Sequence, residues 1–454
     1  MNFTSLVFLP FMFLSFSLFY TFKGRLRYFV LFLINSIFAL TFVKWNYIVL
    51  LIFALYSFFI AFKIKKNSKS IILILLPIIL SFIAFKYINV FNNDLYTPIG
   101  ISFYSFKIIS YLLDVYFGRV KPEKDILVFV NYVSFFPTLV SGPITRYKTF
   151  MESLTNNKFK YITSRNGAFL LACGIFEKMV IADFIGQIVS SIFNNNNLSG
   201  FYMVLGILLY AFQIYVDFDS YSNIAIGASR ILGIDCGVNF KTPYLSSNIK
   251  EFWQRWHISL SSFFKDYVYI PLGGNKKGKI RQNINTMAVF ILSGIWHGST
   301  VNFIIWGFGH GLLSILEGYY FEFYNKLKLP AFIKSINKVI GVIINYVLVS
   351  ILFVFFRSVE FKEAMSILTR VFKPSVFDYT KLGLVSRQWN YLIVMIVVFI
   401  IIELFRYNRQ LIVAVEKRNF VIRWAIYIVM IALFVVFAMY GSQYNAADFI
   451  YKHF

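Results

Sequence analysis

Long apolar segments separated by short polar connections recur along the whole chain. A helix needs roughly 20 mostly apolar residues to cross a hydrocarbon core of ~30 Å, because lipid cannot satisfy unpaired backbone amides and carbonyls. Runs such as LFLINSIFALTFV are continuously apolar, whereas a strand of a membrane barrel would alternate. The pattern therefore predicts an all-α polytopic membrane protein with about 11 to 12 transmembrane helices. The predicted spans are 4–22, 27–43, 46–62, 71–87, 99–117, 167–190, 201–218, 284–298, 301–323, 338–356, 390–405 and 424–440.

Six clusters of basic residues fall in alternate connections between the predicted spans. Because Lys and Arg mark cytoplasmic loops, this alternation places both termini outside the cytoplasm. No basic residue precedes Lys23, whereas a cleaved secretory signal carries its positive charge ahead of its apolar core, so the first span should be retained. The basic clusters lie at 23–27, 63–69, 119–124, 241–281, 326–338 and 406–423.

The composition agrees with a protein embedded in the bilayer. Of the 454 residues, 59% are hydrophobic and 14% are charged, and the formal net charge is +24. A soluble domain could not bury so much apolar surface. The basic residues lie in loops, where they favour anionic lipid over nucleic acid. Cys173 and Cys236 form no CxxC site or disulfide framework. We expect one membrane domain over 1–454, with the bilayer as its partner and no nucleic acid.

One short segment combines apolar residues with helix breakers. Residues 126–149 begin apolar but contain Pro137 and then Gly142-Pro143, with basic residues on both sides. A helix breaker at membrane depth is tolerated where it is buried in protein or lines a wet cavity. The segment is therefore predicted to be re-entrant.

A second segment, 239–283, is too charged to span the membrane yet is rich in Trp, Phe and Tyr. Aromatic residues beside Lys and Arg favour the membrane interface. Helical spacing puts Phe252 and Trp256 on one face and Glu251 and Arg255 on another, which predicts an amphipathic helix in the cytoplasmic leaflet. The turn residues Gly273-Gly274-Asn275 should end this unit.

Three of the four histidines fall between residues 257 and 310. His297 and His310 lie in the apolar hairpin AVFILSGIWHGSTVNFIIWGFGHGLL, and ionisable groups at that depth are functional candidates. Gly298 permits close approach of a ligand or another backbone, so a functional role is favoured for His297. His310, between two glycines, is predicted to pack or to form hydrogen bonds within the hairpin. For His257, an interfacial hydrogen bond and an active-site role both stay open.

The motifs leave a neutral imidazole as the reactive group. His297 and His310 are 13 residues apart without an HExxH spacing or a thiolate or carboxylate cluster, so no metal site is expected. No GxSxG elbow, P-loop or Rossmann glycine pattern occurs. An imidazole with an unperturbed pKa of ~6.5 can accept the proton of a hydroxyl near neutral pH.

At this point the motifs resemble a known family. The block SSNIKEFWQRWHISLSSFFKDYVYIPLGGN, followed by GIWHGSTVNFIIWGFGHG, closely resembles the membrane-bound O-acyltransferases, and in particular their bacterial branch of alginate O-acetylation. The likeness extends to PIGISFYSFKIISYLLDVYFG, FFPTLVSGPITRY, YVDFDSYSNIAIG and YGSQYNAADFIY, with its core over residues 97–311. The chain departs from the family at DFDSYSN, where relatives read DFSGYSD, and at Lys107, where a glutamine or glutamate is common. These departures leave the histidines intact.

The resemblance implies a fold, a site and substrates. The fold is a ring of helices around a thinned, funnel-like centre. His297 of the WHG motif is implied to be the catalytic base and His257 a second active-site residue, with the Trp296 indole near the oxyanion. The implied donor is a cytoplasmic acyl thioester, acetyl-CoA or an acyl carrier protein, with no bound cofactor. The candidate residues for binding the donor or substrate are Trp253, Arg255, Trp256, Trp296, Asn302 and Asp217.

The implied activity is that of a membrane O-acyltransferase in the cell membrane of a bacterium. It would pass an acyl group, acetyl in the acetyl-transfer branch, toward hydroxyls of an extracytoplasmic polysaccharide or cell-wall polymer. A separate SGNH-hydrolase-like protein outside the membrane would complete the transfer. One alternative is D-alanyl transfer to teichoic acid by the same fold.

A transporter is the alternative of another class. Ionisable residues in apolar segments support it, namely Asp114, Glu177, Lys178, Asp183, Asp217 and Asp219. Glu177 and Lys178 could equally pair with neighbours. Transporters commonly show inverted repeats, whereas the polar motifs of this chain are gathered between residues 217 and 311 without a counterpart. The acyltransferase interpretation is therefore favoured.

Overall fold

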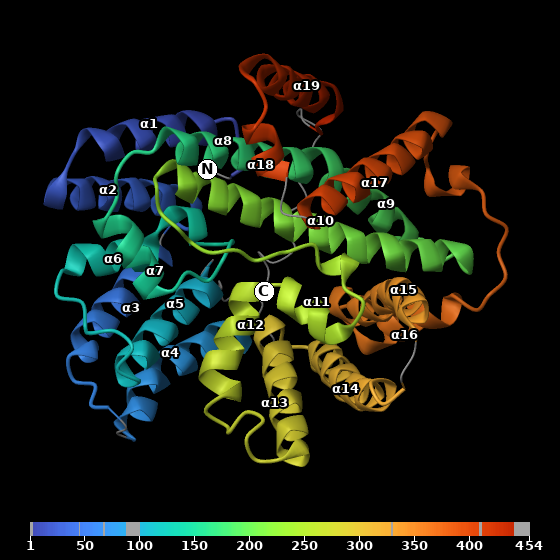
Figure 1. Cartoon of the computed structure of the whole chain (residues 1–454), viewed down its shortest axis with the longest axis horizontal. Helices are drawn as coiled ribbons and strands as arrows, with labels where there is room; N and C mark the ends of the chain where they lie inside the picture. The colour runs from blue at the N-terminus through green and yellow to red at the C-terminus, as the bar shows by residue number, and fades with distance from the viewer. Residues whose placement is uncertain are drawn as a thin grey trace. The chain divides into compact units, whose positions relative to one another are not determined.

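The computed structural model describes residues 3–44, 46–66, 69–87, 100–327, 330–407 and 411–439. Within these ranges the chain forms helices joined by connections, and no strand occurs among them (Figure 1). The chain divides into two compact units. The first comprises the described parts of 1–175 and 219–239, and the second those of 176–218 and 240–448. The prediction of one domain over 1–454, and that of a ring around a funnel, stay predictions.

The first unit contains most of the amino-terminal helices. They are α1 (Phe8–Thr21), α2 (Gly24–Phe42), α3 (Asn46–Ala61), α4 (Ser70–Tyr87), α5 (Ile101–Tyr116), α6 (Ile126–Ser134), the 3-10 turn η2 (Phe136–Thr138), α7 (Tyr147–Thr155) and α8 (Tyr161–Phe176). Asn35 of α2 and Asn131 of α6 are hydrogen-bonded to each other at 3.0 Å, and Asn35 also accepts from the backbone N–H of Phe136. This buried pair fixes α6 and the following turn against α2.

The second unit begins with the π-helix η3 (Glu177–Ala182), α9 (Asp183–Asn194) and the long α10 (Phe201–Ile231), of which residues up to 218 belong to this unit. The 3-10 turn η4 (Pro243–Leu245), α11 (Ile249–Arg255), α12 (Ile258–Phe264), the π-helix η5 (Lys265–Tyr269), α13 (Lys279–His297) and α14 (Val301–Tyr324) follow. The unit ends with α15 (Ala331–Arg357), α16 (Phe361–Arg370), the 3-10 helix η6 (Tyr379–Leu382), α17 (Ser386–Tyr407), α18 (Leu411–Glu416) and α19 (Phe420–Phe437).

Each predicted span falls on a helix, or for 167–190 on the consecutive helices α8, η3 and α9. Six helices of the described chain, α2, α4, α10, α15, α17 and α19, are long and apolar enough to cross a membrane, and two shorter apolar helices are α1 and α3. α19 has no buried residue although its mean hydropathy is 2.5. Apolar faces of this size need lipid rather than water. The chain is thus an all-α polytopic membrane protein, as predicted.

The predicted re-entrant segment is not α-helical around its helix-breaking residues. α6 has nine residues and ends before Pro137, and the next helix, α7, does not begin until Tyr147. Neither helix is long enough to cross a bilayer. The predicted helix break is therefore confirmed, whereas entry into the bilayer stays a prediction.

The prediction of one continuous amphipathic helix within 239–283 is wrong. α11 ends at Arg255, and His257 adopts φ 41° and ψ 53° before α12 begins. Left-handed backbone in a residue other than glycine interrupts a helix and needs support from its surroundings. The predicted faces are confirmed, since Phe252 and Trp256 are buried while Glu251 and Arg255 pair with each other at 2.8 Å.

Candidate functional site

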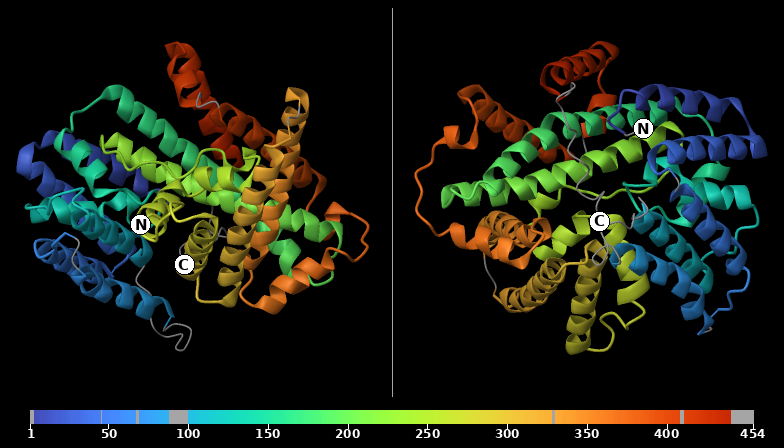
Figure 2. Two further views of the ribbon diagram at one scale, coloured as in Figure 1. Left: turned by 60° about the horizontal axis from the view of Figure 1, so that its bottom comes forward. Right: turned by 180° about the vertical axis from the view of Figure 1, so that it is seen from behind.

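The α13–α14 hairpin carries His297 at the end of its first helix. The two helices lie side by side in Figures 1 and 2 and approach closely. A Cβ atom at Gly294 would lie 2.3 Å from the carbonyl oxygen of Phe303, and one at Gly307 would lie 2.3 Å from a carbonyl oxygen of α13. A Cβ atom at Gly298 would lie 1.9 Å from the ring of Phe303. At Gly298 the close neighbour is thus a side-chain ring, whereas backbone approaches closely at Gly294 and Gly307, and the predicted approach of a ligand or another backbone at Gly298 stays a prediction.

His297 is enclosed by aromatic rings. Its side chain is buried, and its ring centroid lies 4.5 Å from Trp296, 4.9 Å from Trp306 and 5.1 Å from Phe356. The rings come from α13, α14 and the end of α15. An imidazole in such a water-poor environment interacts strongly with nearby charge, because the local dielectric constant is low.

His257 is the second buried histidine of this region. Its ring lies 4.8 Å from Phe218 and 6.2 Å from Trp296. Neither of its ring nitrogens has a hydrogen-bond partner among the described residues. Burial lowers the pKa of His257 from 6.5 to about 3. The imidazole is therefore neutral near pH 7, and the interfacial hydrogen bond that the sequence left open is not formed within the described chain.

His310 extends the same group of rings. Its ring lies 5.0 Å from both Trp253 and Trp306, and it is stacked on Phe252 with an interplanar angle of 3°. Both ring nitrogens of His310 and the indole nitrogens of Trp253 and Trp306 lack hydrogen-bond partners in the part of the chain that the structure describes. The predicted packing role of His310 is confirmed, while a hydrogen-bonding role is not seen.

The rings form one continuous series, which we call the histidine–tryptophan cluster: His257, Trp296, His297, Trp306 and His310. Consecutive centroids in this series are 6.2, 4.5, 4.9 and 5.0 Å apart. Among the described residues, no group of three or more His, Cys, Asp or Glu side chains could hold a metal ion. The cluster offers buried imidazoles and indole N–H groups, which suits proton transfer and stabilisation of a developing oxyanion.

Sequence reasoning did not single out Trp306. It follows Asn302 by four residues and precedes His310 by four, so all three lie on one face of α14. All three are buried. A polar and aromatic stripe at helical spacing in an apolar helix was the signal that could have found it.

A cavity of about 290 Å³ adjoins the histidine–tryptophan cluster. Its walls come from α11, α12, η5 and α13 and include Trp253 and Phe290, which both contact His310. Lys250 and Lys265 also line it. The cavity is therefore lined both by two cationic residues and by aromatic residues that contact the cluster.

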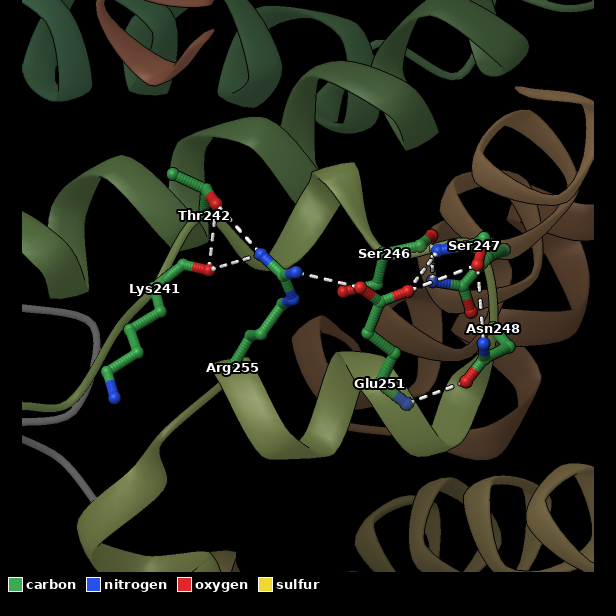
Figure 3. Close-up of polar contacts among 8 residues, drawn as sticks. Lys241, Thr242, Ser246, Ser247, Asn248, Glu251 and Arg255 are labelled. Carbon is green, nitrogen blue, oxygen red and sulfur yellow. Dashed lines mark hydrogen bonds and ion pairs between the residues drawn. The ribbon is translucent and has the colours of Figure 1, made fainter. Parts of the chain in front are cut away.

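Arg255 and Trp256, two predicted donor-binding residues, lie outside this cavity. Arg255 donates hydrogen bonds to the carbonyl oxygen of Lys241, to Thr242 and to Glu251, as Figure 3 shows. Glu251 in turn accepts from the backbone and hydroxyl of Ser247. This is a variant of the capping box at the start of α11. Trp256 is fully buried against rings such as Tyr215 and Phe353.

Asn302 and Asp217 also have structural partners. Asn302 donates to the carbonyl oxygen of Ser358 at 2.7 Å, which ties the start of α14 to the end of α15. Asp217 lies 2.7 Å from the buried ammonium group of Lys178, and Asp183 lies 2.8 Å from it. The structure thus brings Trp253, Trp296, His257 and His297 together through ring contacts, and it places Asp217 in an ion pair.

The remaining ionisable residues that supported a transporter are also engaged. Glu177 pairs with Arg406, and within the first unit Asp114 pairs with Arg119 at 3.1 Å. Asp219 accepts a hydrogen bond from Asn223. Paired charges in apolar surroundings are explained by their partners. This support for transport is therefore weaker than the sequence indicated.

The fold and the site together define a class of protein, namely a polytopic all-α membrane protein with a buried cluster of histidines and tryptophans. The sequence profile of the membrane-bound O-acyltransferase family matches residues 121–359, more than half of the chain. The chain belongs to this family. The matched region contains the whole histidine–tryptophan cluster.

The names of the similar proteins refer to the modification of three different polymers. A probable alginate O-acetylase of Pseudomonas syringae pv. tomato is 40% identical over 220 residues, 48% of this chain and 42% of the relative. A peptidoglycan O-acetyltransferase of Helicobacter pylori is 31% identical over 381 residues, 73% of this chain and 71% of the relative. A teichoic acid D-alanyltransferase of Bacillus subtilis is 32% identical over 296 residues, 60% of this chain and 74% of the relative. The chain spans about half the length of the alginate O-acetylases that it matches.

Proposed function

We propose that this protein is a membrane O-acyltransferase that moves an acyl group from a thioester donor to a hydroxyl acceptor at His297. The observation that carries the proposal is the meeting of His257 and His297 at the indole of Trp296, in a chain of the membrane-bound O-acyltransferase family. The two histidines are 40 residues apart in the sequence. A fold that buries both beside one indole concentrates proton-transfer groups where water is scarce.

His297 acts as the general base in this proposal. One ring nitrogen accepts the proton of the acceptor hydroxyl while the hydroxyl oxygen attacks the carbonyl carbon of the thioester. The tetrahedral intermediate then collapses with cleavage of the carbon–sulfur bond, and the imidazolium returns the proton to the departing thiolate. The products are an ester and a free thiol. Neutral His257 and the indole of Trp296 donate hydrogen bonds to the oxyanion of the intermediate.

The donor is proposed to be an acyl thioester, acetyl-CoA or an acyl carrier protein, that enters through the cavity beside Trp253. Lys250 and Lys265 line that cavity and suit the phosphates of such a donor. Its remaining wall is mainly apolar, which suits an acyl chain. Both lysines belong to the loop 241–281 that the basic pattern marks as cytoplasmic.

The final acceptor, which receives the acyl group after the ester has formed at His297, is proposed to be a hydroxyl of an extracytoplasmic polysaccharide or cell-wall polymer. Support comes from the relatives, whose names specify alginate, peptidoglycan and teichoic acid. The final transfer is assigned to a separate SGNH-hydrolase-like protein outside the membrane. Acetyl and D-alanyl transfer are distinguished by the acyl group found on the polymer.

The ranking of three histidine variants tests the proposed function. His297→Ala should lower ester-linked acetate in the cell polymers by about 10²- to 10⁴-fold, because a positioned general base is lost. His257→Ala should lower it by a similar or smaller factor, as expected for an oxyanion donor. His310→Gln should be milder, because the ring of His310 packs against other rings and forms no hydrogen bond within the described part of the chain. The measurement is acetate and D-alanine released by mild alkali, at matched amounts of protein in the membrane.

Ser299→Ala is the matched control, since Ser299 is exposed beside the same hairpin turn. It should retain the wild-type ester content. Wild-type acetate in the His297→Ala strain would refute the base assignment. D-alanine in place of acetate would keep the mechanism and change the acyl group.

A second prediction concerns the donor cavity. The double variant Lys250→Glu/Lys265→Glu should raise the KM for acetyl-CoA about tenfold or more in inverted membrane vesicles, because two cation–phosphate contacts become repulsive. The released thiol reports the reaction. Arg255→Glu should instead reduce the amount of folded protein, because Arg255 belongs to the network of Figure 3. An unchanged KM in the double variant would place donor entry elsewhere.

A further inference from the structure

A groove bounded by α14, α15 and the start of α11 has a chemistry that the proposed reaction does not use. Its volume is about 660 Å³, within the range of ligand-binding sites. Residues between 313 and 324 of α14 form one wall, and residues between 334 and 348 of α15 form the other. Ser247 and Asn248, labelled in Figure 3, close the groove at α11.

One end of the groove is cationic. Lys334 and Lys338 line it from the first two turns of α15. Like charges one turn apart repel each other, and the start of a helix already carries a partial positive charge. Neither lysine has an ion-pair partner in the described chain. The nearby carboxylate of Glu317 accepts hydrogen bonds from the backbone N–H groups of Ile249 and Lys250, so its charge is directed at α11.

The walls of the groove become apolar away from these lysines. Leu316 of α14 and Ile344 of α15 line it, and they are 54% and 53% exposed. α15 is also a candidate membrane span with a mean hydropathy of 2.7. Exposed apolar side chains on a membrane span contact acyl chains. The groove thus has a cationic end at the start of α15 and an apolar wall farther along this candidate membrane span.

Asn345 places one polar group at the same depth as Ile344, on the buried side of the groove. It lines the groove and is 3% exposed. Its amide nitrogen donates to the carbonyl oxygen of Ser246 at 3.1 Å, whereas its carbonyl oxygen has no hydrogen-bond partner among the described residues. A buried carbonyl without a partner is unfavourable. Asn345 follows Lys338 by seven residues, which is roughly 10 Å along a helix. A ligand whose anionic group lies at the lysines could place a second polar group, or a bound water molecule, beside Asn345.

We propose that this groove binds an anionic phospholipid of the cytoplasmic leaflet. The phosphate lies between Lys334 and Lys338, the hydrated glycerol ester region lies at Asn345, and an acyl chain follows Leu316 and Ile344. The charges select an anionic headgroup, and the apolar walls select a lipid over free phosphate. The bound lipid contacts the start of α11 and so helps to hold that helix in place.

Crosslinking of a photoactivatable phosphatidylglycerol tests this site directly. The full-length protein is reconstituted in phosphatidylcholine nanodiscs that contain the probe, and the labelled peptides are identified by mass spectrometry. The wild type should be labelled on α14 and α15 along the groove. Lys334→Glu/Lys338→Glu should reduce this labelling about tenfold or more, because two attractive charges near the membrane surface become repulsive. Ile344→Trp, which fills the apolar end, should reduce it as well.

Two control variants carry matched changes outside the groove. Lys276→Glu/Lys277→Glu changes the charge equally at two exposed positions, and Ile343→Trp changes a neighbouring exposed residue of α15. Both should be labelled as strongly as the wild type. Unlabelled phosphatidylglycerol should compete, whereas phosphatidylcholine and inorganic phosphate should not. Equal labelling of groove and control variants, or displacement by inorganic phosphate alone, would overturn the proposal.

Discussion

At the scale of single residues, His257 combines two unfavourable features. Its backbone is left-handed, and its buried ring nitrogens lack partners in the described chain. Strained backbone and unpaired buried polar groups each lower stability by about 1–3 kcal/mol, and they persist where the surroundings impose them. Phe218 and Trp296 hold the ring of His257 in place. The site therefore keeps a neutral imidazole ready for a substrate oxygen.

The lowered pKa of His257 predicts sensitivity to acid. Its pKa is about 3 in the folded protein and 6.5 when exposed, so below about pH 6.5 the unfolded state binds a proton that the folded state does not. This contribution to stability is present above pH 6.5 and is lost as the pH falls, by up to about 1.4 kcal/mol per pH unit. Thermal unfolding of the detergent-solubilised protein should therefore show a smaller loss of stability in acid for His257→Gln than for the wild type. Parallel curves for the two proteins would contradict this assignment.

The sequence identified most of the reactive side chains but not their surroundings. His297 could be predicted from its place beside a glycine in an apolar hairpin, and His257 from the family resemblance. The left-handed conformation of His257 could not, because no glycine or asparagine marks it and tertiary packing imposes it. The hydrogen bonds of Arg255 likewise depend on Lys241 and Thr242, which lie 13 or more residues away in the sequence.

At the scale of elements, the α13–α14 hairpin positions His297 through the close approach of its helices. Its apolar runs and glycines made both helices predictable. The break between α11 and α12 was not predictable, because the helical spacing of apolar residues continues through it. Periodicity reports which face is buried, and it does not report a single residue whose backbone is forced out of the helix.

Two identical substitutions on this hairpin should have opposite effects. Gly294→Ala places a methyl group 2.3 Å from the carbonyl oxygen of Phe303, so the helices must separate and His297 must move. We expect a loss of about 1–3 kcal/mol in stability and at least a tenfold loss of activity. At Gly318 of α14 the nearest atom is the Lys279 side-chain nitrogen at 4.0 Å, so Gly318→Ala should stabilise the helix by about 0.5–1 kcal/mol.

Thermal unfolding in detergent and ester content of the polymer measure these two effects. Equal behaviour of the Gly294→Ala and Gly318→Ala proteins would show that close packing of the hairpin does not position His297. Activity lost without any loss of stability would instead locate the effect in the geometry of the site alone.

At the scale of the whole molecule, the positions of the spans were predictable because lipid imposes long apolar segments. The pairing of helices depends on which polar groups meet, such as Asn35 with Asn131. Their 96-residue separation leaves no local pattern that could have predicted the contact.

The orientation of the chain in the membrane is the remaining prediction at this scale. Lys277 lies in the basic connection between η5 and α13, and Asn197 lies in the polar connection between α9 and α10. The alternation of charge therefore places them on opposite sides of the membrane. Both residues are exposed. In a background of Cys173→Ala and Cys236→Ser, we expect Asn197→Cys to react with an impermeant maleimide on intact cells. Lys277→Cys should react only after the cells are opened. Labelling of Lys277→Cys on intact cells would invert the topology and place the cavity of Lys250 and Lys265 on the outer face, where a cytoplasmic thioester could not reach it.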